Sequence, residues 1–340
     1  MSTNQMTDPA GAAAGTAPSD DGPRKQSAIL SRVGRYYLQI AVLLMLVVFC
    51  IIVPDFGSTG NLAAVATQAS YGGIIACGMT LLIAGGLFDL SVAGVVAISA
   101  VITGLALPHT TIGIAILIGL ATGTLLGWIN GLIITKIALP PFIATYGLFN
   151  VYTGVAFIIL NGNVLTIQSV YFNQIGSAAV FGVPVVFLVF IVACVASQLL
   201  LNRTRFGRRL RAVGSSETAA RMAGIPVDRV KIIAFAVTGL FTGLAAIFLA
   251  ALLSSASGTM ATGIELNAIT IAVVGGTSLR GGQGTLLGTF TGAIFLVSLN
   301  TALNLIGVSS YWQNVAIGLV LVLTLVIGAL TRRDKIRGAD

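Results

Sequence analysis

Most of the chain consists of apolar runs about as long as a lipid bilayer is thick. Ten such runs occur, at residues 36–53, 62–85, 88–107, 111–135, 142–160, 184–201, 231–253, 264–279, 284–306 and 311–330. Each is close to the roughly 20 residues that a helix needs to cross the hydrocarbon core. Because lipid offers no hydrogen-bond partners, helices are the structure that satisfies the backbone of such runs. The sequence therefore predicts an all-α, polytopic membrane protein with about ten transmembrane helices.

The composition excludes an ordinary soluble domain. Of the 340 residues, 56% are hydrophobic and only 8% are charged. The net charge of +8 lies mostly in short segments beside the runs, where orientation and anionic lipid account for it, so we expect a lipid bilayer and no nucleic acid as partner. The three cysteines lack metal-ligand spacing and His109 stands alone, so we expect no metal site and no cofactor.

One polar segment, residues 202–231, sets the orientation of the protein. It carries eight of the 18 basic residues and only two acids, Glu217 and Asp228, so the positive-inside rule places it in the cytoplasm. An even number of spans then puts both termini in the cytoplasm, in agreement with the basic residues after Thr331. We expect a disordered cytoplasmic tail at 1–27, a transmembrane domain at 28–331 and a second tail at 332–340.

Within the polar segment the sequence predicts a short helix at 215–224. Ser215 or Ser216 can cap its N-terminus, Glu217 lies in its first turn, and Gly224 ends it before Pro226. A helix of this size is too small for a domain. Its place on a cytoplasmic loop favours docking to another protein.

Glycines mark two kinds of position in the runs. Two sets recur every four residues, and we interpret them as sites of close helix packing: Gly119, Gly123, Gly127 and Gly131, and Gly284, Gly288 and Gly292. Two double glycines, Gly85-Gly86 and Gly275-Gly276, form a faint parallel repeat, for which chance is the alternative. Irregular backbone at membrane depth is tolerated where it lines a cavity, so the paired breaks favour a transport pathway.

Asp89, Glu265 and Arg280 are the ionisable residues within or next to the runs. Asp89 can cap the helix that follows it, or it can line or gate a pathway; we expect capping. Glu265 belongs either to the pathway or to the outer interface. No phosphate loop, zinc motif or nucleophile elbow occurs, so we expect no enzymatic activity. Uphill transport then needs an ion gradient or another subunit, and the basic loop favours the second.

Several blocks resemble the ribose-type ABC sugar importer permeases, over about residues 36–330. They are GMTLLIAGGLFDLSVAGVVAIS from Gly78, NGLIITKIALPPFIATYG from Asn130, GRRLRAVGSSETAARMAGIPVDRVK from Gly207, ELNAITIAVVGGTSLRGGQGTLLGTFTGAI from Glu265, and NLIGVSSYWQ from Asn304. The resemblance implies a non-catalytic, multi-pass permease of a prokaryotic cytoplasmic membrane. It also implies a homodimer that binds cytoplasmic ATP-binding subunits and accepts a monosaccharide or small polyol from an extracytoplasmic sugar-binding protein.

The resemblance also assigns roles to residues. The family's coupling helix maps onto 215–224, where Glu217, Ala219 and Ala220 match its Glu-x-Ala-Ala signature. We expect the ATPase-coupling residues to be Arg208, Ser216, Glu217, Ala219, Ala220, Arg221 and Gly224. We expect the translocation pathway to include Gly85, Gly86, Asp89, Glu265, Asn267, Gly275 and Gly276.

One departure and two alternatives stay open at this point. Phe88 stands in GGLFDLS, where many relatives have Gly-Ile-Asp-Leu-Ser, and this leaves the sugar undetermined. A secondary transporter of a small polar solute would also have broken helices, but we would expect more intramembrane acids in it. A membrane scaffold would explain the docking loop without a pathway.

Overall fold

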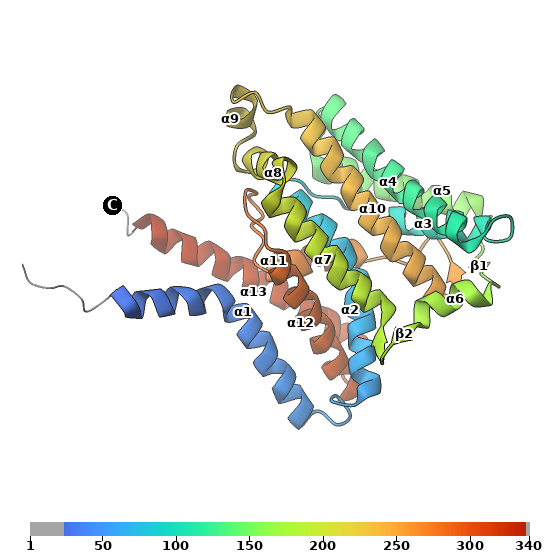
Figure 1. Cartoon of the computed structure of the whole chain (residues 1–340), viewed down its shortest axis with the longest axis horizontal. Coiled ribbons are helices and arrows are strands. Elements are labelled where there is room, and N and C mark those ends of the chain that lie inside the picture. Colours follow the sequence, from blue (N-terminus) through green and yellow to red (C-terminus); the bar gives the residue numbers. More distant parts are fainter. Residues whose placement is uncertain (1–23, 338–340) are drawn as a thin grey trace, which may run out of the picture.

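The computed structural model describes residues 24–337, and their backbone is almost entirely helical (Figure 1). Within this range there are thirteen helices and four two-residue strands. The helices are α1 (Arg24–Ile52), α2 (Thr59–Ala84), α3 (Val92–Ala106), α4 (Ile112–Lys136), α5 (Pro141–Ile159), α6 (Val170–Ser177), α7 (Val185–Arg203), α8 (Arg205–Ser215), α9 (Glu217–Met222), α10 (Val227–Leu253), α11 (Ile264–Val274), α12 (Leu286–Leu305) and α13 (Ser310–Arg337). The strands are β1 (Leu165–Thr166), β2 (Ala179–Val180), β3 (Val183–Pro184) and β4 (Ser255–Ala256).

The ten apolar runs all become apolar helices. In the described part of the chain, six helices are long and apolar enough to cross a membrane, and shorter apolar helices occupy the other four runs. The predicted all-α polytopic fold is therefore confirmed. Helix α1 already begins at Arg24 and α13 continues to Arg337, so helix extends into both segments assigned to tails, while residues 1–23 of the N-terminal tail lie outside the described residues.

The prediction that every run is nearly long enough to span the bilayer is wrong for run 264–279. Its helix α11 has 11 residues, which is about 16 Å of helix, roughly half of the hydrocarbon core. The double glycine ends it at Val274, since Gly276 has φ +87°, a left-handed backbone conformation. Helix α3 is also short, with 15 residues, because residues 85–91 form a non-helical connection before it.

Helix α2 forms the centre of the molecule. Its residues from Tyr71 to Ala84 are nearly all buried, and it packs against α7, α10, α11 and α12 (Figure 1). Helix α1 lies at the edge and packs against α12, where Val53, Phe56 and Ala302 form a separate small apolar cluster. The central position of α2 means that changes at either of its ends reach most of the fold.

The glycine ridge on α4 packs against α10, as the spacing predicts. A Cβ atom on Gly123 would meet the Cα of Gly243 at 2.8 Å, and one on Gly127 would meet the Cα of Gly239 at 3.0 Å. The two backbones therefore touch without side chains between them, which is the use of small residues in membrane helices. In the second ridge, Gly288 and Gly292 of α12 lie against the backbones of Gly275 and Ile271, whereas Gly284 precedes the helix and is not part of the packed face.

Short strands join loops, once between segments that lie far apart in the sequence and once within a hairpin. Strand β1 pairs with β4 in antiparallel fashion, with Leu165 opposite Ala256, so two outer loops are joined. The strands β2 and β3 form a hairpin next to α6. On the other side of the bundle, α8 forms a helix where the sequence predicts only a polar loop, and the charge pattern places it with α9 in the cytoplasm.

Candidate functional site

Helix α9 confirms the short helix predicted in the basic segment. The Ser216 hydroxyl oxygen accepts a hydrogen bond from the backbone N–H of Ala219 at 3.2 Å, so Ser216 is the N-cap. At the other end Gly224 adopts φ +74°, and the N–H of Ile225 donates to the carbonyl of Ala220 at 3.0 Å. This six-to-one bond is the Schellman pattern that glycine allows. Both ends of α9 are therefore fixed by local sequence.

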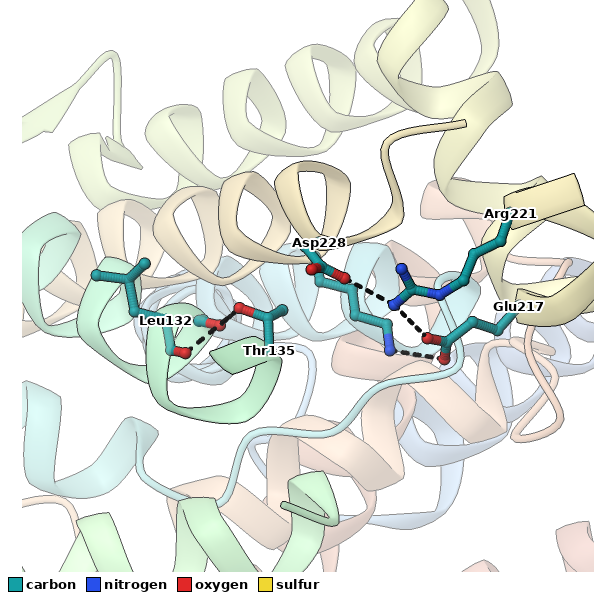
Figure 2. Close-up of polar contacts among 7 residues, drawn as sticks. Leu132, Thr135, Glu217, Arg221 and Asp228 are labelled. Atoms are coloured by element: carbon teal, nitrogen blue, oxygen red, sulfur yellow. Dashed lines mark hydrogen bonds and ion pairs between the residues drawn. The ribbon is translucent and has the colours of Figure 1, made fainter. Parts of the chain in front are cut away.

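An ion-pair cluster ties α9 to the start of α10 (Figure 2). Arg221 Nη2 lies 3.0 Å from Glu217 Oε1 and 2.7 Å from Asp228 Oδ1, and Lys231 Nζ lies 2.7 Å from Glu217 Oε2. The hydrogen bond from Lys231, followed by that from Arg221, holds the pKa of Glu217 below its usual range. Ion pairs of exposed side chains are strongly screened by water, so the cluster orients α9 more than it stabilises the protein.

The other coupling candidates divide between buried and exposed positions. Ala220 is buried against the core, whereas Ala219 is exposed on α9 and Arg208 is exposed on α8. Met222 was not among the sequence candidates, yet its apolar side chain is 80% exposed. Helix α9 therefore presents a small apolar surface next to a group of ion-paired charges, an arrangement suited to contact with another protein.

Directly before α9, three chain segments meet backbone to backbone; we call this contact the glycine junction and define it by Gly85, Gly86, Gly214, Gly281 and Gly282. The last turn of α8 contributes Gly214, where a Cβ atom would meet Gly282 N at 2.8 Å and the carbonyl carbon of Gly85 at 2.9 Å. The N–H of Gly282 donates to the carbonyl of Ala84 at 2.8 Å. The end of α2 and the loop between α11 and α12 are thus both in contact with α8.

The two double glycines form the same kind of helix end. The N–H of Leu87 donates to the carbonyl of Leu82 at 2.9 Å, and the N–H of Thr277 donates to that of Ala272 at 3.0 Å. Gly86 and Gly276 both have positive φ, at +73° and +87°. Helices α2 and α11 therefore both end in Schellman motifs, so the matching glycines have a common structural effect.

Asp89 lies in a buried polar cluster between the 85–91 connection and helices α4 and α5. It is 1% exposed. Its Oδ1 accepts from the backbone N–H of Ser91 at 2.8 Å and from the Ser91 hydroxyl at 2.6 Å, and its Oδ2 accepts from Asn130 Nδ2 at 3.2 Å. The Tyr152 hydroxyl donates to Asn130 Oδ1 at 2.7 Å. The carboxylate thus accepts from a backbone N–H at the start of α3 and also joins α3 to two neighbouring helices.

Glu265 and Asn267 both lie on the first turns of α11. The Glu265 carboxylate accepts from the N–H of Gly263 at 3.1 Å, at the start of its own helix. Asn267 lines a cavity of about 300 Å³ between α2, α10, α11, α12 and α13. The candidate pathway residues therefore do not form one constellation: Asn267 lies beside the early turns of α11, whereas Gly275 and Gly276 lie at its end.

These features define a class of protein, a polytopic helical membrane protein with a small capped helix in its basic polar segment. Residues 61–325 match the family model described as "Branched-chain amino acid transport system / permease component". The chain is 36% identical to the ribose import permease protein RbsC of Bacillus subtilis (strain 168), over 85% of this chain and 90% of that protein. It is 34% identical to the L-arabinose transport system permease protein AraH of Escherichia coli (strain K12), over 93% and 97%.

A further relative is the L-arabinose ABC transporter permease protein AraH of Azospirillum brasilense, which is 31% identical over 94% of this chain and 96% of that protein. No solved structure matches the chain significantly. The chain belongs to this permease family. It is a non-catalytic permease component of an ABC importer in the bacterial cytoplasmic membrane, and it works with ATPase and binding-protein partners. The secondary transporter and the scaffold are therefore set aside.

Proposed function

We propose that the chain carries a monosaccharide of the ribose or arabinose class, or a related small polyol, into the cell. The proposal is supported by the relatives that match nearly the whole chain, since their names specify ribose or L-arabinose. The family description names branched-chain amino acids instead, and these are the second candidate substrate. The sugar is favoured because the named relatives cover more of the chain than the family model does.

Helix α9 is the proposed contact for the ATP-binding subunit, and this is the observation that carries the coupling mechanism. Its two capped ends and its ion pairs to α10 hold a defined surface in the cytoplasm. We assign this contact to the residues expected from the sequence, Arg208, Ser216, Glu217, Ala219, Ala220, Arg221 and Gly224, and add Met222. We also propose a homodimer, because each chain contributes one α9 and an ABC importer uses two ATP-binding domains.

The coupling route runs through the glycine junction. A displacement of α9 moves the last turn of α8, where Gly214 contacts the end of α2 and the loop before α12. Because these contacts are between backbones, no side chain can rotate to absorb the motion. The expected pathway residues Gly85, Gly86, Gly275 and Gly276 then act as movable helix ends, Asp89 holds the start of α3, and Glu265 and Asn267 face the outer half.

Reconstituted transport tests the substrate and the partners together. The permease, its ATP-binding subunit and its solute-binding protein are placed in proteoliposomes, and uptake of radiolabelled D-ribose, L-arabinose and L-leucine is followed with and without ATP. We expect ATP-dependent uptake of at least one sugar and none of L-leucine. Uptake of L-leucine alone would refute the proposed substrate class. The mass of the purified complex tests the homodimer, and we expect it to contain two permease chains.

A further inference from the structure

The cavity beside Asn267 lies among the apolar helices and is partly lined by polar side chains. It has a volume of about 300 Å³, at the lower end of the range for small-molecule sites, roughly 300–1,000 Å³. Its polar side chains come from α2, the loop before α11, α11 and α12; they are Gln68, Tyr71, Thr262, Asn267 and Asn300. Apolar residues form the remaining wall, together with the backbone of Gly72.

Two of these polar groups lack partners. The Tyr71 side chain is 6% exposed, and its hydroxyl has no hydrogen-bond partner among the described residues. The same holds for Oδ1 of Asn300. Nine described side chains have such an unpaired buried atom, and Tyr71 and Asn300 are the two of them that line this cavity. Their place beside the cavity allows a ligand or water to supply the missing hydrogen bonds.

Both residues lie within apolar helices long enough to cross a membrane. Tyr71 is twelve residues from the outer end of α2 at Thr59, which is about 18 Å of helix. Asn300 lies five residues before the end of α12 at Leu305, about 7 Å from the outer side. Polar side chains at this depth face a water-filled or ligand-filled space, because hydrocarbon would leave them unsatisfied.

The chemistry of the lining specifies the kind of ligand. None of the described residues that line the cavity is Asp, Glu, Lys, Arg or His. A carboxylate or an ammonium group would find no opposite charge here, which makes an amino acid a poor fit. Amides and hydroxyls both donate and accept, so they suit a neutral molecule with several hydroxyl groups. The apolar wall suits the C–H surface of a sugar ring.

We infer that this cavity is a binding site for a neutral monosaccharide in the outer half of each permease chain. The inference rests on the proposed function and extends it by locating a sugar site within a single chain. The site receives the sugar on the extracytoplasmic side. Hydrogen bonds from Tyr71, Asn267 and Asn300 replace those between the sugar hydroxyls and water, and they are few enough that the sugar is not held tightly.

Thiol protection measures this binding without transport. Val297 lines the cavity, whereas Cys50 is a free, exposed cysteine and Cys77 and Cys194 are buried. The permease that carries Val297→Cys together with Cys50→Ser is therefore labelled in nanodiscs with a small maleimide at increasing D-ribose or L-arabinose. We expect either sugar to slow labelling, and L-leucine to leave it unchanged. Unaltered labelling at saturating concentrations of both sugars, while the complex still imports sugar, would overturn the site and leave the proposed function intact.

Tyr71→Phe separates a binding role from a structural one. The hydroxyl bonds nothing in the described chain, so its removal is expected to leave thermal stability equal or raised. If the sugar uses it, the concentration for half protection rises about 2- to 10-fold, as for one lost hydrogen bond. Asn300→Leu is expected to act in the same direction.

Asn304→Leu is the matched control, because Asn304 is an exposed amide on the same helix and does not line the cavity. It should leave protection unchanged. Wild-type protection in both Tyr71→Phe and Asn300→Leu would refute the assignment of these residues. Loss of sugar uptake in the wild-type complex, by contrast, concerns the proposed function alone, since protection is read without the ATP-binding subunit.

Discussion

Replacing Gly214 by alanine tests whether the glycine junction carries the coupling motion. Gly214 lies in the last turn of α8, one residue before the helix ends at Ser215. The new Cβ atom would approach the carbonyl oxygen of Ala84, the N of Gly282 at 2.8 Å and the carbonyl carbon of Gly85 at 2.9 Å. All three are backbone atoms, so α8 itself must shift away from the membrane domain.

The expected change in folding free energy is modest. Overpacking of this kind destabilises a protein by about 1–3 kcal/mol, while the higher helix propensity of alanine compared with glycine stabilises it by up to about 1 kcal/mol. The net destabilisation is therefore roughly 0–3 kcal/mol. Sugar import per ATP hydrolysed should fall much more than stability, because a shift of α8 changes the position of α9 and the contact between α8 and the end of α2.

The assay is the number of sugar molecules imported per ATP hydrolysed in proteoliposomes. Gly60→Ala is the matched control, since Gly60 lies in the first turn of α2 and a Cβ atom there meets nothing within 4 Å. We expect Gly214→Ala to keep ATP hydrolysis and lose most uptake, and the control to retain both. Wild-type import per ATP in Gly214→Ala would refute the argument that motion passes through this junction.

Three further predictions follow from the remaining contacts. Asp89→Asn should lower the free energy of unfolding by about 0.5–1.5 kcal/mol and keep transport, whereas Asp89→Ala should lower it by about 1–3 kcal/mol because buried donors are left unpaired. Thermal unfolding measures both. A stable Asp89→Asn complex without transport would instead show that the pathway requires the charge. The pKa of Glu217 is lowered in the folded protein. The stabilisation from its ion pairs is therefore fully present above the unfolded pKa of about 4.3 and is lost as the pH falls through the lower folded pKa. Sugar import per ATP measured from pH 5 to 8 should show no step from this group, and a step that Glu217→Gln removes would contradict the lowered pKa. Gly123→Ala should destabilise the fold by roughly 0–3 kcal/mol from the same two effects, since its Cβ meets the α10 backbone. Gly113→Ala meets nothing within 4 Å and should leave the amount of folded protein in detergent extracts unchanged or raised.

The sequence predicts those parts of the fold that are determined locally. The apolar runs identify the membrane helices because length and hydropathy are properties of one segment. Helix α9 is predicted correctly because its cap at Ser216 and its end at Gly224 lie within ten residues of each other. The packing of the α4 ridge follows from the four-residue spacing alone, although the identity of its partner, α10, does not.

The sequence does not predict features that depend on contacts between distant segments. Strands β1 and β4 pair across 90 residues of chain, and no local pattern indicates this. Helix α8 is missed for a local reason, because its four arginines give the segment the composition of an ordinary solvated loop. Tyr71 and Asn300 were missed as well, because an unpaired hydroxyl or amide is recognised only when its surroundings are known.

The glycine junction and the proposed sugar cavity are connected by the same two helices, α2 and α11. Helix α2 ends in the glycine junction at Gly85 and lines the cavity with Tyr71. Helix α11 lines the cavity with Asn267, and the loop that follows it enters the junction at Gly281. Since α2 is a continuous helix between these points, a shift of its cytoplasmic end also moves the cavity wall about 20 Å away. A motion that starts at α9 therefore reaches the proposed sugar cavity through the backbone of α2.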